Sequence, residues 1–281
     1  MIAFVVISGV IILFVYRYQK EIGEGYEEVG RKAAPIRSQV LPVPQQFKDI
    51  LQKYFRFYQQ LSAPNKIKFE RKVCYFIYRK QFIPRNVDEV SIEAKVLIAA
   101  SAVQLTFGLP DLYLQHFNKI LVYPNDYYSS ITKRFHKGEV NPRFRVIVLS
   151  WQSFIDGYIT PTDSINLGLH EMAHALRLEN IIRNDEDDFF DEHLLEKFDE
   201  LAQNICNNTQ NWSESFFRPY ACANVHEFFA VSVENFFERS EAFKQQIPEL
   251  YDILSKLLNL DPLLLQETIN SPRSLPSDPL S

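Results

Sequence analysis

The chain has 281 residues, and its 46% hydrophobic content is ample for a packed globular core. It carries 30 Lys plus Arg against 35 Asp plus Glu, a formal net charge of −5, so it lacks the basic excess that binding to a phosphate backbone requires. We therefore expect no nucleic-acid partner.

The first segment is an apolar run. Residues Ile2 to Tyr16 carry no charge, and Arg17 and Lys20 follow them. This predicts an uncleaved membrane anchor over residues 1–18, because a cleaved signal peptide needs positive charge before the run and a small-residue cleavage site after it. Basic residues after the run place the body in the cytoplasm. We therefore expect a single-pass protein of the bacterial inner membrane whose domain faces the cytoplasm. The alternative is a soluble cytoplasmic protein with a buried N-terminal helix, because the run is short for a core of roughly 30 Å.

A linker and three helices are predicted next. Residues 19–42 mix charge with prolines, which is typical of a linker. Between Gln45 and Phe82 apolar residues recur at intervals of three and four, which predicts two amphipathic helices separated near residues 62–65. The alanine-rich segment Ile92–Phe107 is apolar almost all round and predicts a buried helix.

The second half of the chain mixes strands and helices. Short β-type runs at Lys119–Tyr123 and Phe144–Trp151 predict a small sheet. After Pro161, capping residues precede a helix that contains the sequence HEMAH, and two further helices are expected at Leu194–Asn204 and about Asn224–Arg239. The domain over residues 43–268 is thus predicted to be α+β and mostly helical, with its sheet beside the HEMAH helix. Residues 269–281 are predicted to be a disordered tail.

The three cysteines are Cys74, Cys206 and Cys222. They are odd in number, widely separated and without CxxC spacing, so they suggest neither a disulfide framework nor a thiolate zinc site. On this basis a reducing compartment fits best.

The sequence HEMAH has the spacing of a zinc-peptidase motif. At about 3.6 residues per turn, His170 and His174 share one helix face and can both reach one zinc ion. Glu171 lies next to the first ligand and is placed to take a proton from a zinc-bound water, which then attacks a peptide carbonyl. The alternative is a helix with two ordinary histidines. Apolar flanks such as Leu169, Ala173 and Leu176 argue against that alternative, because they predict a buried helix. Burying ionisable side chains is costly unless a partner such as a metal ion compensates them.

A catalytic zinc needs a third protein ligand and one open position. Glu227 lies in the apolar sequence HEFFAVSVENFFE, where an unpaired carboxylate would be costly and a metal ion would offset that cost. Glu234 lies seven residues further on, near the same helix face. The other downstream residues that chemistry alone allows are Glu179, the acidic residues 185–192, His193, Glu196 and His226.

At these residues the sequence resembles the Mlc titration factor A family of bacterial zinc peptidases, whose catalytic core is similar to that of anthrax lethal factor. The resemblance covers roughly residues 41–260, through LSAPNKIKFERKV, VLIAASAVQLTFGL, INLGLHEMAHAL and the EFFAVSVENFF helix. It implies a zincin-like domain with one Zn²⁺ ion on His170, His174 and Glu227. It also implies that Tyr220 is an active-site tyrosine that steadies the oxyanion. Glu234 matches a further family glutamate and is expected to orient a ligand.

Two functions remain open at this stage. The first is a membrane-tethered metallopeptidase that hydrolyses peptides or a protein partner. In this hypothesis Arg145–Trp151 is an edge strand that pairs with the substrate backbone, and the alternative is that it is an ordinary core strand. The alternative, which the family's name suggests, is a regulatory binding protein that sequesters a transcription regulator, with zinc in a structural role. Glu171 favours hydrolysis, because only hydrolysis needs a general base beside the metal.

Overall fold

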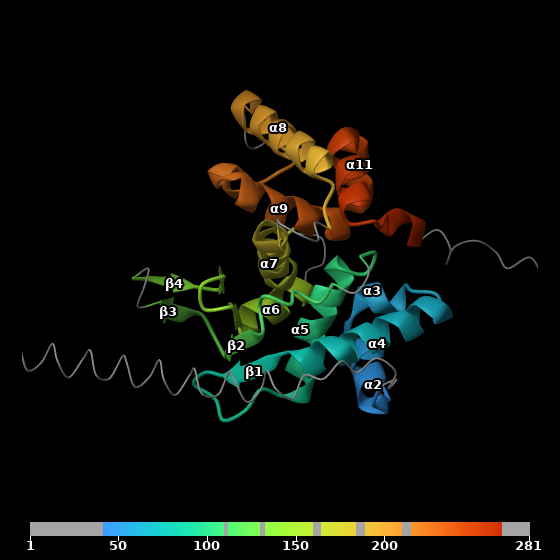
Figure 1. Cartoon of the computed structure of the whole chain (residues 1–281), viewed down its shortest axis with the longest axis vertical. Helices are drawn as coiled ribbons and strands as arrows, with labels where there is room; N and C mark the ends of the chain where they lie inside the picture. The colour runs from blue at the N-terminus through green and yellow to red at the C-terminus, as the bar shows by residue number, and fades with distance from the viewer. Residues whose placement is uncertain are drawn as a thin grey trace, which may run out of the picture. The chain divides into compact units, whose positions relative to one another are not determined.

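The computed structural model describes residues 42–109, 112–129, 133–159, 164–183, 189–209 and 215–265. All the helices and strands in these ranges belong to one compact unit, Val43–Ser281 (Figure 1). The predicted anchor over residues 1–18 and tail over 269–281 lie outside the described residues, as does the predicted linker apart from Pro42.

The first four helices of the described residues include a buried one, as predicted. They are α2 (Gln45–Tyr54), α3 (Arg56–Gln59), α4 (Ala63–Arg79) and the buried α5 (Ile92–Leu105). Helix α5 is buried over most of its surface and packs against α2, α4 and α7. Ser91 caps it by accepting a hydrogen bond from Ala94 N at 3.1 Å. An apolar helix of this kind has no solvent face, which explains why its sequence shows no amphipathic stripe.

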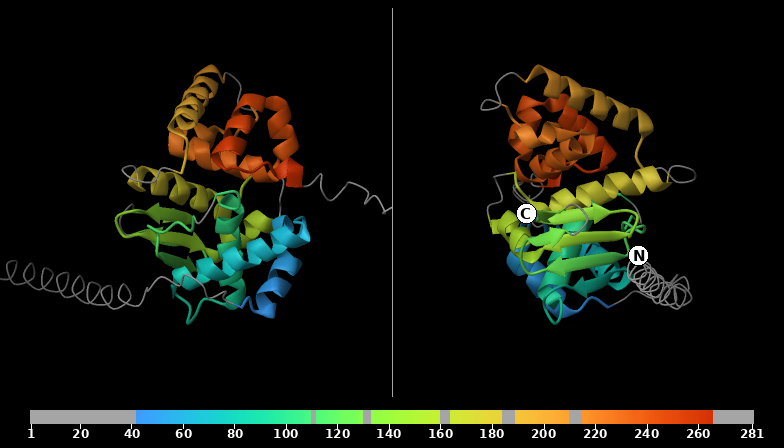
Figure 2. Two further views of the ribbon diagram at one scale, coloured as in Figure 1. Left: turned by 45° about the vertical axis from the view of Figure 1, so that its right-hand side comes forward. Right: turned by 90° about the vertical axis from the view of Figure 1, so that its left-hand side faces the viewer.

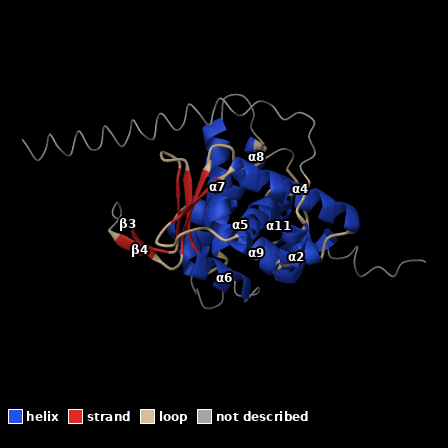
Figure 3. Ribbon diagram, turned by 90° about the horizontal axis from the view of Figure 1, so that it is seen from below, coloured by secondary structure: helices blue, strands red, loops and turns tan. Residues whose placement is uncertain are grey.

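A four-stranded sheet packs beside these helices. Its order is β1 (Gln81–Pro84), β2 (Lys119–Tyr123), β6 (Val146–Ser150) and β5 (Gly138–Asn141). The first three strands are parallel, and β5 runs antiparallel to β6 with Val140 opposite Ile147. A separate hairpin joins β3 (Tyr127–Ser129) and β4 (Arg134–His136). Figure 3 shows the strands together on one side of the helices.

The prediction that Arg145–Trp151 supplies the edge strand is wrong. Its strand, β6, is paired on both sides, by β2 and β5, and the edge near the motif helix is β5. The physical reason is that the turn at residues 142–145 folds β5 back onto β6, so that the hydrogen-bonding groups of β6 are used within the sheet.

The remaining helices complete the unit. They are α6 (Trp151–Ile159), α7 (Leu167–Arg183), α8 (Glu192–Asn208), the short 3₁₀ helix η1 (Pro219–Ala223), α9 (Val225–Glu238), α10 (Ser240–Gln246) and α11 (Pro248–Leu257). Helix α7 contacts β5 and β6 on one side and α9 on another. Figure 2 shows α7 between the sheet and the layer formed by α8 to α11. The described residues are thus mostly helical with a small sheet, which confirms the predicted α+β class.

The predicted single-pass membrane localisation is corrected by the structure. None of the described helices is both long enough and apolar enough to cross a bilayer. The most apolar one, α5, has 14 residues and therefore spans about 21 Å of the roughly 30 Å required. The longest helices have 17 residues and carry charged side chains, for example Glu70 in α4 and Arg177 in α7.

Candidate metal centre

Helix α7 presents its two histidines as neighbours on one face. The Nε2 atoms of His170 and His174 lie 3.1 Å apart, and their rings are nearly perpendicular, at 87°. Asn166, just before the helix, accepts a hydrogen bond from Leu169 N at 3.0 Å and so caps the first turn. The capped start and the spacing of four residues therefore aim both imidazoles at one point.

Glu227 brings a carboxylate to the same point from α9. Its Oε2 lies 3.1 Å from His170 Nε2 and 3.4 Å from His174 Nε2. It occupies the first turn of α9, where Asn224 caps the helix by accepting hydrogen bonds from His226 N and Glu227 N. Among the described residues, His170, His174 and Glu227 form a group able to hold a metal ion.

The three ligand atoms fit a tetrahedral zinc ion. Bonds of about 2.0–2.1 Å at a tetrahedral centre place neighbouring ligand atoms about 3.3–3.4 Å apart. The observed separations of 3.1, 3.1 and 3.4 Å are close to this value. The donor set of two imidazoles and one carboxylate is also one that catalytic zinc accepts. Glu227 Oε2 is buried and accepts no well-formed hydrogen bond from the described residues, so a cation is the partner it lacks.

The electrostatics also favour a cation. Burial opposes a charge on His170, but the adjacent carboxylates of Glu227 and Glu234 outweigh it and raise the pKa of His170 to about 10. Burial likewise opposes a charge on Glu227, but the two histidines lower the pKa of its carboxyl well below the ordinary value. Positive charge is therefore strongly favoured between these residues, and a metal ion supplies it without a proton.

Glu171 lies beside the cluster in a buried position. It is 5% exposed, and burial raises the pKa of its carboxyl above the ordinary value against the opposing effect of the two histidines. Its side chain packs against Gly138 of β5, where an added Cβ would lie 2.6 Å from Glu171 Cδ. The edge strand thus leaves room for this carboxylate only because residue 138 is a glycine.

Tyr220 is brought to the cluster by η1. Its ring centroid lies 6.2 Å from that of His170, and the residue is 52% exposed. Burial and the neighbouring carboxylate of Glu227 raise the pKa of Tyr220 to about 12. The hydroxyl therefore keeps its proton and can donate a hydrogen bond at the edge of the site.

Glu234 binds the ring nitrogen of His170 that faces away from the ligand atoms. His170 Nδ1 donates a hydrogen bond to Glu234 Oε1, which leaves Nε2 as the free ligand atom, because a carboxylate can only accept. Glu234 is 1% exposed. Its charge is matched by Arg218, whose Nη1 and Nη2 donate to the two carboxylate oxygens at 2.7 and 2.9 Å.

Comparison with known sequences agrees with this geometry. The family model described as glucose-regulated metallo-peptidase M90 matches residues 29–258, which is most of the chain. The chain belongs to the M90 metallopeptidase family. Its membership of the Mlc titration factor A family, predicted from the motifs, is thereby confirmed.

Two relatives of this M90 chain have been found among curated proteins. An uncharacterized protein of Synechocystis sp. is 27% identical over 238 residues, which cover 79% of this chain and 86% of the relative. Mlc titration factor A of Pectobacterium atrosepticum is 27% identical over 211 residues, which cover 67% of this chain and 76% of the relative.

The structure brings together all the residues that the sequence singled out for an M90 site, and of the other candidate ligands none that the structure describes joins the group. Glu179 is buried on α7 but accepts hydrogen bonds from His116 N at 3.1 and 2.9 Å. His193 and Glu196 are exposed on α8. His226 neighbours Glu227 without joining the ligand group, and burial and Arg177 lower the pKa of its imidazole. Within the acidic stretch 185–192, residues 185–188 lie outside the described residues.

Sequence reasoning missed Arg218 and a disulfide. Arg218 stands two residues before Tyr220, and no motif marks it. Cys206 and Cys222 are bonded, with a Cα–Cα distance of 5.6 Å, so the prediction of no disulfide is wrong, and the inference of a reducing compartment loses its basis. The reason is tertiary: α8 packs against η1, which brings together cysteines 16 positions apart.

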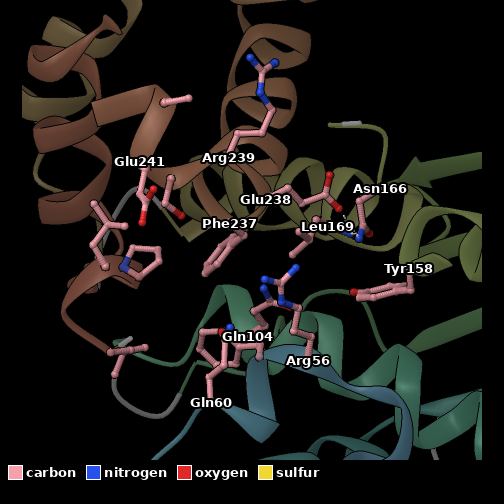
Figure 4. A pocket seen from close by; sticks show the side chains of 16 residues that line it. Arg56, Gln60, Gln104, Tyr158, Asn166, Leu169, Phe237, Glu238, Arg239 and Glu241 are labelled. Carbon is pink, nitrogen blue, oxygen red and sulfur yellow. Dashed lines mark hydrogen bonds between the residues drawn. The ribbon is translucent and has the colours of Figure 1, made fainter. Parts of the chain in front are cut away.

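A separate cavity lies near the start of α7. Its volume is about 370 Å³, and its walls include Arg56, Gln104, Tyr158, Phe237 and Glu238 (Figure 4). None of the three ligand residues lines it. Asn166 connects its wall to the metal centre: Nδ2 donates to Glu238 Oε1 at 3.0 Å, and the backbone N lies 3.4 Å from Glu234 Oε2.

Proposed function

We propose that the chain is a zinc-dependent metallopeptidase with a zincin-like catalytic domain over residues 43–268. The observation that carries this proposal is the set of three ligand atoms within 3.4 Å of one another, with the carboxylate of Glu171 next to them on the same helix. The M90 family assignment supports a peptidase, and the donor set of His170, His174 and Glu227 supports zinc.

Each residue then has a chemical role. His170, His174 and Glu227 hold one Zn²⁺ ion, which supplies Lewis acidity for the addition of water to a peptide carbonyl. Glu171 takes a proton from the attacking water and passes it to the leaving amine. Burial suits it to this role, because its raised pKa makes the carboxylate a stronger base. Glu234 holds the His170 ring in the tautomer that exposes Nε2.

Tyr220 completes the proposed mechanism. Its hydroxyl is protonated at neutral pH and lies beside Glu227, so it can donate a hydrogen bond to the oxyanion that forms when water attacks the carbonyl. Its exposure leaves room for a substrate to approach from that side. Edge strand β5 is the strand of the sheet that can pair with an extended substrate backbone there.

The Glu171→Gln variant tests the proposal. We expect it to retain one zinc ion per chain and to lose peptide hydrolysis by at least about 10²-fold, because the amide cannot accept the proton. Glu179→Gln is the matched control, because Glu179 is also buried on α7 but bonds to His116 away from the ligands. Metal analysis measures the zinc content, and an unbiased peptide library measures hydrolysis. Cleavage by Glu171→Gln at the wild-type rate would overturn the mechanism.

A second function is supported by one relative. The name of Mlc titration factor A describes a protein that titrates Mlc, so a role in binding a regulatory protein is the alternative for this chain. Glu171→Gln separates the two functions, since partner binding does not need a general base. A wild-type protein that binds zinc and a partner but cleaves no peptide in the library would favour the binding function.

A further inference from the structure

We propose that Arg218 is a positioning residue of this metal site, an inference that rests on the proposed zinc function. Its guanidinium fixes the carboxylate of Glu234, and Glu234 in turn fixes the ring of His170. The hydrogen bonds of Arg218 go to Ser164 and Glu234, and none goes to the three ligand atoms. It acts through another residue, and its effect should appear in how tightly and with what geometry the metal is held.

The contacts of Glu234 carry the first step. Nη1 and Nη2 of Arg218 donate to Oε2 and Oε1 at 2.7 and 2.9 Å, so both carboxylate oxygens are held in the plane of the guanidinium. The same Oε1 accepts the hydrogen bond from His170 Nδ1. A rotation of the Glu234 carboxylate would therefore break its bonds to Arg218 as well as its bond to His170. The direction of the His170 ring is set through this pair.

The burial of Glu234 carries the second step. Glu234 is 1% exposed, whereas the Arg218 side chain is 27% exposed, so the carboxylate depends on protein donors for its orientation and its charge balance. Besides His170, its other close donor in the described residues is Asn166 N, at 3.4 Å, which is a long contact. The arginine is thus the principal fixed partner of Glu234.

Arg218 also ties together three segments of the site. Its Nη1 donates to Ser164 O, in the segment just before α7, and its two nitrogens bind Glu234 on α9. Arg218 is itself the residue that precedes η1, the short helix that carries Tyr220. One side chain therefore joins the helix with the two histidines, the helix with the third ligand and the turn with the tyrosine.

Lysine should not replace this arginine. A planar guanidinium can bond both carboxylate oxygens at once, whereas an ammonium is a point charge that cannot fix the carboxylate plane. Arg239 offers the matched control. It lies at the end of α9, stacks over Phe216 at 4.4 Å and lies 3.4 Å from Asn235 Oδ1, without contacting Glu234. Its loss removes an arginine from the same region but leaves the path to His170 intact.

The experiment measures metal binding by the full chain. Zinc affinity is measured by competition with a chromogenic chelator for wild type, His170→Ala, Arg218→Gln, Arg218→Lys and Arg239→Gln, and the visible spectrum of the Co²⁺ form reports ligand geometry. We expect Arg218→Gln to lose about 10–100-fold in zinc affinity and to show an altered Co²⁺ spectrum, because loss of an outer partner disorients a ligand. Arg218→Lys should lose nearly as much, and Arg239→Gln should match wild type.

Chemical rescue separates positioning from folding. In Arg218→Ala, free guanidinium at a non-denaturing concentration should restore part of the lost zinc affinity, whereas an equal concentration of sodium chloride should not. The side chain is exposed enough for a small cation to enter. Unchanged zinc affinity and an unchanged Co²⁺ spectrum in both Arg218→Gln and Arg218→Lys would overturn the proposal.

The two proposals can fail separately. If the wild type and His170→Ala bind zinc equally, the proposed metal site itself is refuted. If the wild type binds one ion that His170→Ala loses, and the Arg218 variants behave like the wild type, only the role of Arg218 is refuted.

Discussion

Gly138→Ala should move Glu171, the proposed catalytic base, while leaving the three proposed metal ligands in place. A Cβ built on Gly138 lies 2.6 Å from both Cγ and Cδ of Glu171, whereas carbon atoms in ordinary contact are at least about 3.5 Å apart. The Glu171 side chain must therefore shift by about 1 Å. No glycine of the described residues has a positive φ angle, so alanine causes no backbone strain at this position.

The expected loss is larger in catalysis than in stability. A displacement of about 1 Å at a reacting group can cost about 10²-fold in rate, so kcat for peptide hydrolysis should fall by about that factor. Crowding the buried carboxylate should cost about 1–3 kcal/mol in free energy of unfolding. Zinc stoichiometry should remain at one, because the clash is with Glu171 and with none of the three ligand residues.

The assay compares Gly138→Ala, Glu171→Gln and the double variant. If the added methyl group acts through Glu171, the double variant should be no slower than Glu171→Gln alone, because the base is already lost. Additive losses would show that Gly138 acts by another route. A Gly138→Ala enzyme with wild-type kcat would refute the reasoning from the packing of Glu171 against β5.

Three further variants test other parts of the structure. Tyr220→Phe should keep zinc but lower kcat by about 10²–10³-fold, and an unchanged kcat would remove the hydroxyl from the mechanism. Replacing Cys206 and Cys222 by serine should lower the free energy of unfolding by about 3 kcal/mol, because the bond closes a loop of 16 positions; urea unfolding with and without a reductant checks this, and equal stabilities would contradict it. Burial lowers the pKa of Lys80 to about 7, so from pH 7 to 9 the unfolded chain holds a proton that the folded protein releases, and stability should rise with pH. This rise, measured by urea unfolding, should be about 2 kcal/mol smaller in Lys80→Met, and an equal rise in both proteins would refute the shifted pKa.

The sequence predicted the parts of the site that depend on local spacing. His170 and His174 share a helix face whatever the rest of the fold does, and the buried helix at Ile92–Leu105 follows from a segment that is apolar all round. The sequence could also favour Glu227 over other acidic residues, because a carboxylate within an apolar segment such as FFAV needs a partner that compensates its burial.

The parts that were missed depend on tertiary contacts. The edge strand was assigned to β6, because periodicity identifies a strand but not its neighbours in the sheet, and β5 is too short and polar to show a β pattern. Arg218 precedes a 3₁₀ turn, where an arginine looks like any surface cation until Glu234 is placed beside it. The Cys206–Cys222 bond likewise arises only when α8 meets η1.

The proposed ligands of the metal ion come from two helices that are far apart along the chain. His174 on α7 and Glu227 on α9 are separated by the whole of α8 and η1. An unfolded chain cannot hold these donors together, so an ion that prefers the assembled set adds its binding free energy to folding, by about 4 kcal/mol at a free concentration 1,000 times the dissociation constant. If zinc binds as proposed, it joins the layer of α8 to α11 to helix α7 beside the sheet, and a cell short of the metal would then hold a less stable protein as well as an inactive one.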